Sequence, residues 1–152
     1  MREILFRGQA TNRELDLPYR TKYKNGDWVY GLLTCVKNYN GFSEMTNTDG
    51  IVGIKVDKNT VGQFTGKVDK NATKIFEGDV FQLEDDIVAV VIFSDGCFRL
   101  EEYGLCGTWT ESGYDECGGG YGIIECEPID WYFLKDMEII GNIHDNPELI
   151  PC

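Results

Sequence analysis

The sequence is poor in groups that carry acid–base chemistry near neutral pH. His144 is its only histidine among 152 residues, and histidine is the side chain whose ordinary pKa lies nearest neutrality. A serine or cysteine nucleophile needs such a base beside it. Adjacent carboxylates such as Glu84/Asp85 and Glu101/Glu102 are expected by chance among 26 acidic residues,. We therefore expect no catalytic residue and no enzyme activity.

Long apolar runs are also absent. No stretch of 18 or more apolar residues occurs, so the sequence contains no candidate membrane-spanning helix,. The first seven residues, MREILFR, lack the apolar core and the cleavage site of a signal peptide,. The sequence therefore predicts a soluble protein that stays in the cytoplasm where it is made and has no membrane partner.

Helical patterns are scarce because 18 glycines interrupt the chain,. Apolar and β-branched runs bounded by Gly, Asn and Asp predict strands instead, and the expected strands are 2–8, 28–34, 51–56, 79–84, 87–94, 97–103, 131–134 and 138–144. The polar stretch 35–50 predicts a long loop. We expect a mainly β protein with few, short helices, and a β-rich α+β fold is the alternative.

The clearest predicted unit is a hairpin of Ile87–Ser94 and Cys97–Tyr103 around the turn Asp95-Gly96, a dipeptide that suits the left-handed dihedrals of a two-residue hairpin turn. Its first strand is almost continuously apolar, which predicts a strand covered on both faces or lying in a subunit contact. Together with the strand at 79–84, the hairpin predicts a curled antiparallel meander. We expect this meander to close as a small SH3-like barrel.

The length and the 42% apolar content fit one domain over residues 1–152,. Its expected parts are an N-terminal β segment at 1–56, core strands at 57–103 and 128–152, and a mobile loop excursion at 104–127. The glycine run 118–120 in this excursion lacks the Gly-Lys-Ser/Thr ending of a phosphate-binding loop,. It therefore predicts a flexible loop.

One stretch begins like a calcium-binding loop. Asp69, Asn71 and Thr73 stand at the first three ligand positions,. The glycine required next is Lys74, and the bidentate glutamate is replaced by Val80,. The stretch therefore predicts a polar hairpin loop and no metal or other cofactor.

The six cysteines raise the same question for zinc. Structural zinc sites need two ligands on one tight turn, and no such pair occurs among Cys35, Cys97, Cys106, Cys117, Cys126 and Cys152. Cytosolic thiols are normally kept reduced. We expect buried or incidental thiols, with a cysteine zinc site as the minor alternative.

Charge is unevenly distributed along the chain. Residues 1–75 carry 12 Lys and Arg against 8 Asp and Glu, whereas residues 76–152 carry 2 against 18. Such an acidic half repels phosphate backbones, so nucleic acid is an unfavourable partner for it. The acidic half is either a solvated surface, or it attracts the basic half of a neighbouring subunit across a head-to-tail contact.

Six phrases run in order from one end of the chain to the other: REILFR from Arg2, NGDWVYG from Asn25, VGQFTG from Val61, DKN from Asp69, KIFEGDV from Lys74 and IIGNIHDNPEL from Ile139. Jointly they resemble the YopX family of phage and prophage proteins. The resemblance implies a protein encoded by a phage or prophage and made in bacterial cytoplasm, and it implies no reaction, cofactor or catalytic residue. The family's usual Asn-Gly turn is Asn71-Ala72 here. Because alanine is strained at positive φ, we expect this turn to be rearranged around Asn71.

Two functions follow as hypotheses. The preferred one is a non-enzymatic accessory protein, expected to be a homo-oligomer or to bind a host or phage protein. Its contacts would be strand edges and the aromatic residues Trp28, Tyr30, Trp109 and Trp131, for which core packing is the competing role. The alternative is a nucleic-acid-related role, either direct binding by the basic first half or mimicry of DNA by the acidic second half.

Overall fold

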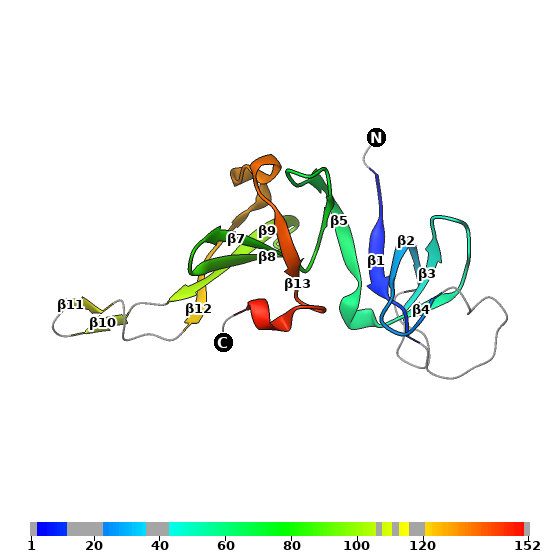
Figure 1. Cartoon of the computed structure of the whole chain (residues 1–152), viewed down its shortest axis with the longest axis horizontal. Coiled ribbons are helices and arrows are strands. Elements are labelled where there is room, and N and C mark those ends of the chain that lie inside the picture. The colour runs from blue at the N-terminus through cyan, green and yellow to red at the C-terminus, as the bar shows by residue number, and fades with distance from the viewer. Residues whose placement is uncertain are drawn as a thin grey trace. The chain divides into compact units, whose positions relative to one another are not determined.

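The computed structural model describes residues 3–11, 23–35, 43–105, 108–110, 113–115 and 121–150. The chain folds as two compact units, Met1–Gly66 and Lys67–Cys152, drawn in Figure 1. The predicted mainly β class is confirmed, since the only helices in the described residues are four three-residue 3-10 helices: η1 (Lys58–Thr60), η2 (Ile129–Trp131), η3 (Leu134–Asp136) and η4 (Pro147–Leu149). The single domain over 1–152 stays a prediction.

The first unit is an antiparallel sheet. The strands of this sheet, in the order in which they pair, are β4 (Ile54–Val56), β3 (Ser43–Asn47), β2 (Trp28–Cys35), β1 (Phe6–Gln9), β5 (Gly62–Val68) and β6 (Lys74–Phe76), the last of which belongs to the second unit. The strand predicted at 28–34 is confirmed as β2. Strand β3 lies inside the stretch 35–50, so the prediction of a long loop without a strand there was wrong. Its buried face consists of Ser43, Met45 and Asn47, and two polar residues of these three hide the alternation that marks a strand.

This sheet curls around a small core of Ala10, Val29, Met45 and Val56. Ala10, just after β1, forms an isolated antiparallel bridge with Val56 at the end of β4. The two segments also share backbone hydrogen bonds of 2.9 and 3.0 Å, from Asp57 N to Gln9 O and from Thr11 N to Lys55 O. The bridge brings the residue after β1 against the end of β4 but is not a continuous ladder.

Gly31 allows β2 to approach β3 closely. A Cβ added at Gly31 would lie 1.9 Å from the backbone oxygen of Thr46 and 2.7 Å from the Cα of Asn47. No side chain fits there without moving the backbone, because neither neighbouring atom is the end of a flexible side chain. Packing therefore requires Gly31, the second glycine of the phrase NGDWVYG.

The second unit contains the predicted meander. Strands β7 (Asp79–Glu84), β8 (Ile87–Ser94) and β9 (Cys97–Leu105) pair in succession, and the sheet order is β12-β9-β8-β7-β13, with β12 at Tyr121–Pro128 and β13 at Ile139–Asn142. The predicted SH3-like barrel is wrong for the described residues, because this sheet is open and ends in the edge strands β12 and β13. Two further strands, β10 (Thr108–Thr110) and β11 (Gly113–Asp115), pair with each other.

Strand β12 begins inside the range 104–127 that the sequence predicts as a loop excursion. It pairs with β9 from Tyr121 opposite Leu105 to Pro128 opposite Arg99, with an irregularity between Ile123 and Glu125. Its sequence, YGIIECEP, offers two β-branched residues, Ile123 and Ile124, but no clear apolar/polar alternation, and it follows a glycine run and ends in proline. Pairing with the neighbouring β9 outweighs this weak local preference.

The β8–β9 hairpin is confirmed at its turn and in its strands. Asp95 and Gly96 have φ values of 49° and 78°, as a turn with two left-handed residues requires,. One face of β8 contributes Ala89 and Val91 to the core cluster around Phe81 and Leu100. The other face contributes Val88 and Val90 to a second cluster with Val80. Coverage on both faces accounts for the apolar run without a subunit contact.

The strand predicted at 131–134 is wrong. Local backbone hydrogen bonds form instead, from Tyr132 N to Ile129 O at 3.3 Å and from Met137 N to Leu134 O at 3.1 Å, and they produce η2 and η3. The alternation in Trp-Tyr-Phe-Leu does correspond to sidedness, since Leu134 is buried whereas Trp131 and Phe133 are exposed. No neighbouring strand pairs with this segment in the described residues.

Candidate functional site

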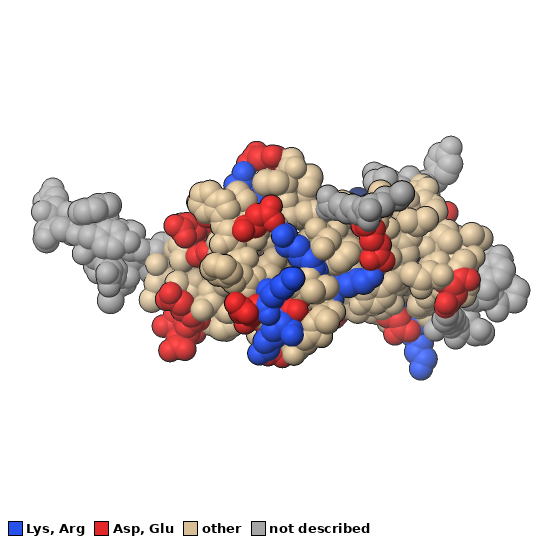
Figure 2. Space-filling view, turned by 90° about the horizontal axis from the view of Figure 1, so that it is seen from above, with Lys and Arg blue, Asp and Glu red and all other residues tan. Residues whose placement is uncertain are grey.

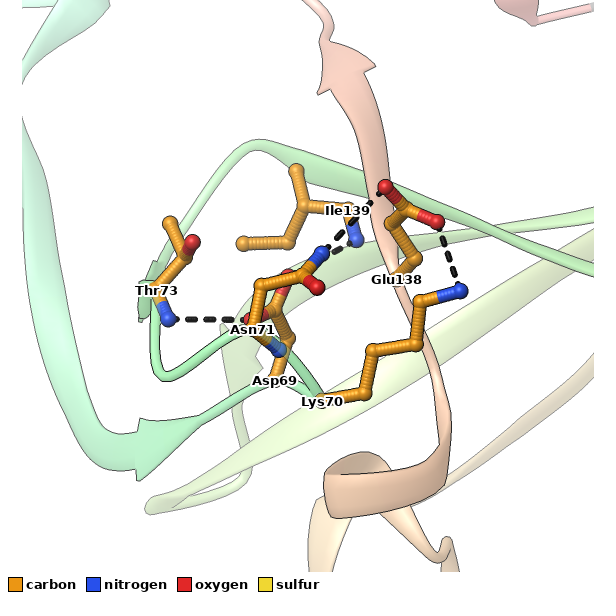
Figure 3. Close-up of polar contacts among 6 residues, drawn as sticks. All are labelled: Asp69, Lys70, Asn71, Thr73, Glu138 and Ile139. Atoms are coloured by element: carbon orange, nitrogen blue, oxygen red, sulfur yellow. Dashed lines mark hydrogen bonds and ion pairs between the residues drawn. The ribbon is translucent and has the colours of Figure 1, made fainter.

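The stretch with the calcium-loop pattern is the turn between β5 and β6 (Lys74–Phe76). The Asp69 side chain, only 4% exposed, accepts three backbone hydrogen bonds. Oδ1 accepts from Asn71 N at 2.8 Å and from Thr73 N at 2.9 Å, and Oδ2 accepts from Ile139 N at 3.2 Å. Figure 3 shows Asp69 lying between the turn that holds Thr73 and the strand that begins at Ile139.

Hydrogen bonding controls the charge state of this carboxyl group. Burial alone would raise the pKa of Asp69, but the N–H groups of Thr73, Ile139 and Asn71, together with the Thr73 hydroxyl, outweigh burial and hold the pKa below its ordinary 3.8,. Both carboxylate oxygens are thus engaged by backbone donors. Asp69 clamps the turn to the segment that enters β13, which is a structural role.

Ala72 contradicts the expected rearrangement of this turn. It adopts the left-handed conformation, with φ of 60°, although alanine pays a steric cost there. Backbone hydrogen bonds from Ala72 N to Asp69 O at 3.1 Å and from Asp69 N to Thr73 O at 2.9 Å complete the turn. Together with the Asp69 carboxylate, they hold the glycine-type geometry with alanine in the glycine position.

A second set of contacts ties the same turn to residues 137–139. Lys70 N donates to Met137 O at 2.9 Å, and the Lys70 ammonium lies 2.7 Å from Glu138 Oε2. Asn71 Nδ2 donates to Glu138 Oε1 at 3.3 Å. The Lys70 hydrogen bond and charge lower the pKa of Glu138. Since the ion pair is about half exposed, it adds little stability beside the Asp69 clamp.

Asp79 and Asn142 clamp turns in the same way. Asp79, 2% exposed, accepts from Phe76 N at 2.8 Å across the turn that contains Gly78, whose φ is 88°. Asn142 Oδ1 accepts from His144 N and Asp145 N, both at 3.0 Å. His144 therefore lies in a turn that Asn142 holds.

The paired carboxylates at 101 and 102 are separated by the strand geometry. Glu101 lies opposite Cys126 and Glu102 lies opposite Glu125 on β12, and adjacent residues of a strand point to opposite faces. Tyr103 donates its hydroxyl hydrogen bond to Glu101, and Tyr132 donates to Glu102. Glu101 and Glu102 therefore do not form an acid–base pair.

The cysteine pattern is only partly described. Cys35, Cys97 and Cys126 are free, partly buried thiols, whereas Cys106, Cys117 and Cys152 lie outside the described residues. No group of three or more His, Cys, Asp or Glu residues in the described part of the chain could hold a metal ion.

The four candidate binding aromatics have different surroundings. Trp28 is partly buried, and its ring lies 4.7 Å from the Arg7 guanidinium carbon. Tyr30 is 40% exposed and Trp131 is 71% exposed. The side chain of Trp109 lies outside the described residues.

The main feature that sequence reasoning missed is the connector between β12 and β13. We call residues 129–137 the aromatic connector; it appears as the orange turns before β13 in Figure 1. Ile129 and Leu134 anchor it in the core with exposures of 5% and 4%, whereas Trp131 and Phe133 are 71% and 81% exposed. Tyr132, between these two, hydrogen-bonds to the buried Glu102. The sequence marks the cluster Ile-Asp-Trp-Tyr-Phe-Leu but does not show which rings point outward.

The charge asymmetry coincides with the two units. Counted within the unit bounds, the first carries 9 Lys and Arg against 7 Asp and Glu, and the second carries 5 against 19. In the view of Figure 2, acidic side chains (red) occur at several separate places.

The protein is mainly β, with antiparallel sheets whose turns are held by buried Asp and Asn side chains. Asp69, Asp79 and Asn142, which lie in the sequence motifs, thus stabilise the fold. The family model described as YopX protein matches residues 16–151, and the chain belongs to this family. No curated protein sequence matches it. Within the described residues, no helix is long and apolar enough to cross a membrane.

Proposed function

We propose that this chain is a non-enzymatic phage or prophage accessory protein whose second unit binds another protein in the bacterial host. The aromatic connector is the observation that supports the proposal. Trp131 and Phe133 are held outward on a segment whose neighbours Ile129 and Leu134 are buried. Rigid, exposed aromatic side chains are typical anchors of protein–protein interfaces.

The energetics favour binding at this segment. An aromatic side chain buries about 150–250 Å², and each Å² of apolar area removed from water contributes about 25 cal/mol. The local 3-10 hydrogen bonds and the bond from Tyr132 to Glu102 already order the connector. Binding a partner therefore requires little further ordering of this segment, and such ordering usually reduces affinity.

Charge favours a different protein over a symmetric pair of copies. Two second units would bring 19 acidic residues each against 5 basic ones, and like charges across an interface oppose association. The same charge opposes nucleic-acid binding by this unit.

The test is capture from a lysate of the bacterial host, with the purified chain as bait. The variant Trp131→Ala/Phe133→Ala should lose a partner that the wild type retains, and the partner is identified by mass spectrometry. Tyr30→Ala, which removes an exposed ring from the first unit, is the matched control and should retain it. Equal capture by all three proteins would refute the proposal. Light scattering on the same samples tests self-association.

A further inference from the structure

Three glutamates share one face of the second sheet. Glu127 lies opposite Leu100, and Glu125 lies opposite Glu102. Leu100 and Glu102 are two residues apart on β9, so they point to the same face. This is the face covered by the core cluster that includes Leu100, Ile129 and Leu134. Glu102, Glu125 and Glu127 therefore stand beside the aromatic connector.

Tyr132 lies within the electrostatic influence of these three glutamates. Burial raises the pKa of its phenol most, and the hydrogen bond to Glu102 and the charges of Glu102, Glu125 and Glu127 raise it further. The negative potential of all three carboxylates therefore reaches the residue between Trp131 and Phe133. Asp130, also next to Trp131, is 2.6 Å from Lys67 in an ion pair, so its charge is partly offset.

We propose that the surface made by the aromatic connector with Glu125 and Glu127 takes a lysine- or arginine-bearing segment of the partner protein; this inference rests on the proposed function. Arg and Lys stack on the faces of Trp and Phe rings, and their charges complement Glu125 and Glu127, which are exposed and partly exposed. The long-range charge of the second unit steers such a segment toward the surface.

The charge distribution separates this occupant from the other candidates. A second copy offers a second unit that repels and a first unit whose charge is nearly balanced, 9 basic against 7 acidic residues. An acidic segment or a nucleic acid is repelled. Only a cationic protein segment satisfies both the rings and the carboxylates.

The test is fluorescence anisotropy with short labelled peptides on the full chain. One peptide alternates Arg and Ala, and its counterpart alternates Glu and Ala at the same length. The Arg peptide should bind, more weakly at higher salt, and the Glu peptide should not. Trp131→Ala/Phe133→Ala and, separately, Glu125→Gln/Glu127→Gln should each weaken binding about tenfold, which corresponds to about 1.4 kcal/mol.

Two controls keep these effects specific. Tyr30→Ala removes a ring and Asp49→Asn removes a charge from the first unit, and both should bind the Arg peptide as the wild type does. Near-UV circular dichroism checks that each variant keeps the packing of the wild type. The inference is overturned if the Arg peptide does not bind, if both peptides bind equally, or if the glutamate variant binds unchanged.

The outcomes also separate this inference from the proposed function. If the lysate partner is lost with Trp131→Ala/Phe133→Ala but retained by Glu125→Gln/Glu127→Gln, the proposed function holds and the cationic segment is refuted. A dimer that disappears with the aromatic variant identifies a second copy as the occupant and likewise refutes the cationic segment.

Discussion

Replacing Asp69 by Asn tests the turn clamp. In the wild type, Ile139 N donates to Asp69 Oδ2 at 3.2 Å. An Asn side chain keeps one oxygen for the N–H groups of Asn71 and Thr73, but it would place an NH2 donor against the N–H of Ile139. A hydrogen bond to a charged group contributes about 1.5–3 kcal/mol. Asp69→Asn loses one such bond and weakens two others at a site 4% exposed. We expect the free energy of unfolding to fall by about 2–3 kcal/mol.

The assay is urea unfolding followed by circular dichroism. With a slope of about 1 kcal/mol per molar urea, the midpoint should fall by about 2 M. Asp86→Asn, which changes an exposed carboxylate in the β7–β8 turn, is the control and should leave the midpoint unchanged. An Asp69→Asn midpoint equal to that of Asp86→Asn would refute the clamp.

The pH dependence gives an independent check. The folded pKa of Asp69 is lowered from 3.8, so its contribution to stability is complete above the unfolded pKa and is lost as the pH falls through the folded pKa. The stability difference between the wild type and Asp69→Asn should be constant from about pH 5 to pH 8 and should shrink below about pH 4. A difference that stays constant into acid would show that the carboxylate charge plays no part.

Three further predictions concern single positions. Ala72→Gly should raise the free energy of unfolding by about 0.5–1 kcal/mol in the same urea assay, since glycine adopts the observed φ of 60° without strain,; a lower midpoint would contradict the turn geometry. Gly31→Ala should cost about 3 kcal/mol, because its Cβ would lie 1.9 Å from Thr46 O,, and a wild-type midpoint would contradict this packing. Tyr132→Phe should cost about 2 kcal/mol by leaving buried Glu102 without its donor,. In a spectrophotometric titration it should also remove a tyrosine that ionises above the ordinary pKa of 10, and an unchanged titration curve would contradict that assignment.

Sequence reasoning succeeded where the local pattern and the tertiary contacts agree. Asp95-Gly96 predicts a hairpin turn, and the apolar run from Ile87 predicts a strand covered on both faces or lying in a subunit contact. The turn was confirmed because a two-residue turn needs few distant contacts, and the strand was confirmed because core clusters cover both of its faces. The same reasoning failed for β3, whose buried residues are mostly polar, and for β12, which depends on its pairing with β9.

The site was harder to predict because it depends on distant neighbours. The pattern at Asp69 showed that calcium ligands are missing, but only the structure shows Ile139 N, 70 residues away in sequence, donating to its carboxylate. Ala72 was expected to avoid positive φ, a rule that the hydrogen bonds around Asp69 override. Sequence identified the aromatic cluster near Trp131, whereas the burial of Ile129 and Leu134 decides which rings face outward.

The central claim is that the motif residues hold the fold whereas the aromatic connector makes the contacts. The most direct measurement determines partner capture and urea midpoint on the same samples of wild type, Asp69→Asn and Trp131→Ala/Phe133→Ala. The account predicts that Asp69→Asn lowers the midpoint and retains the partner under native conditions, whereas the aromatic variant keeps the midpoint and loses the partner. Loss of the partner by a folded Asp69→Asn protein, with capture unchanged in the aromatic variant, would contradict it.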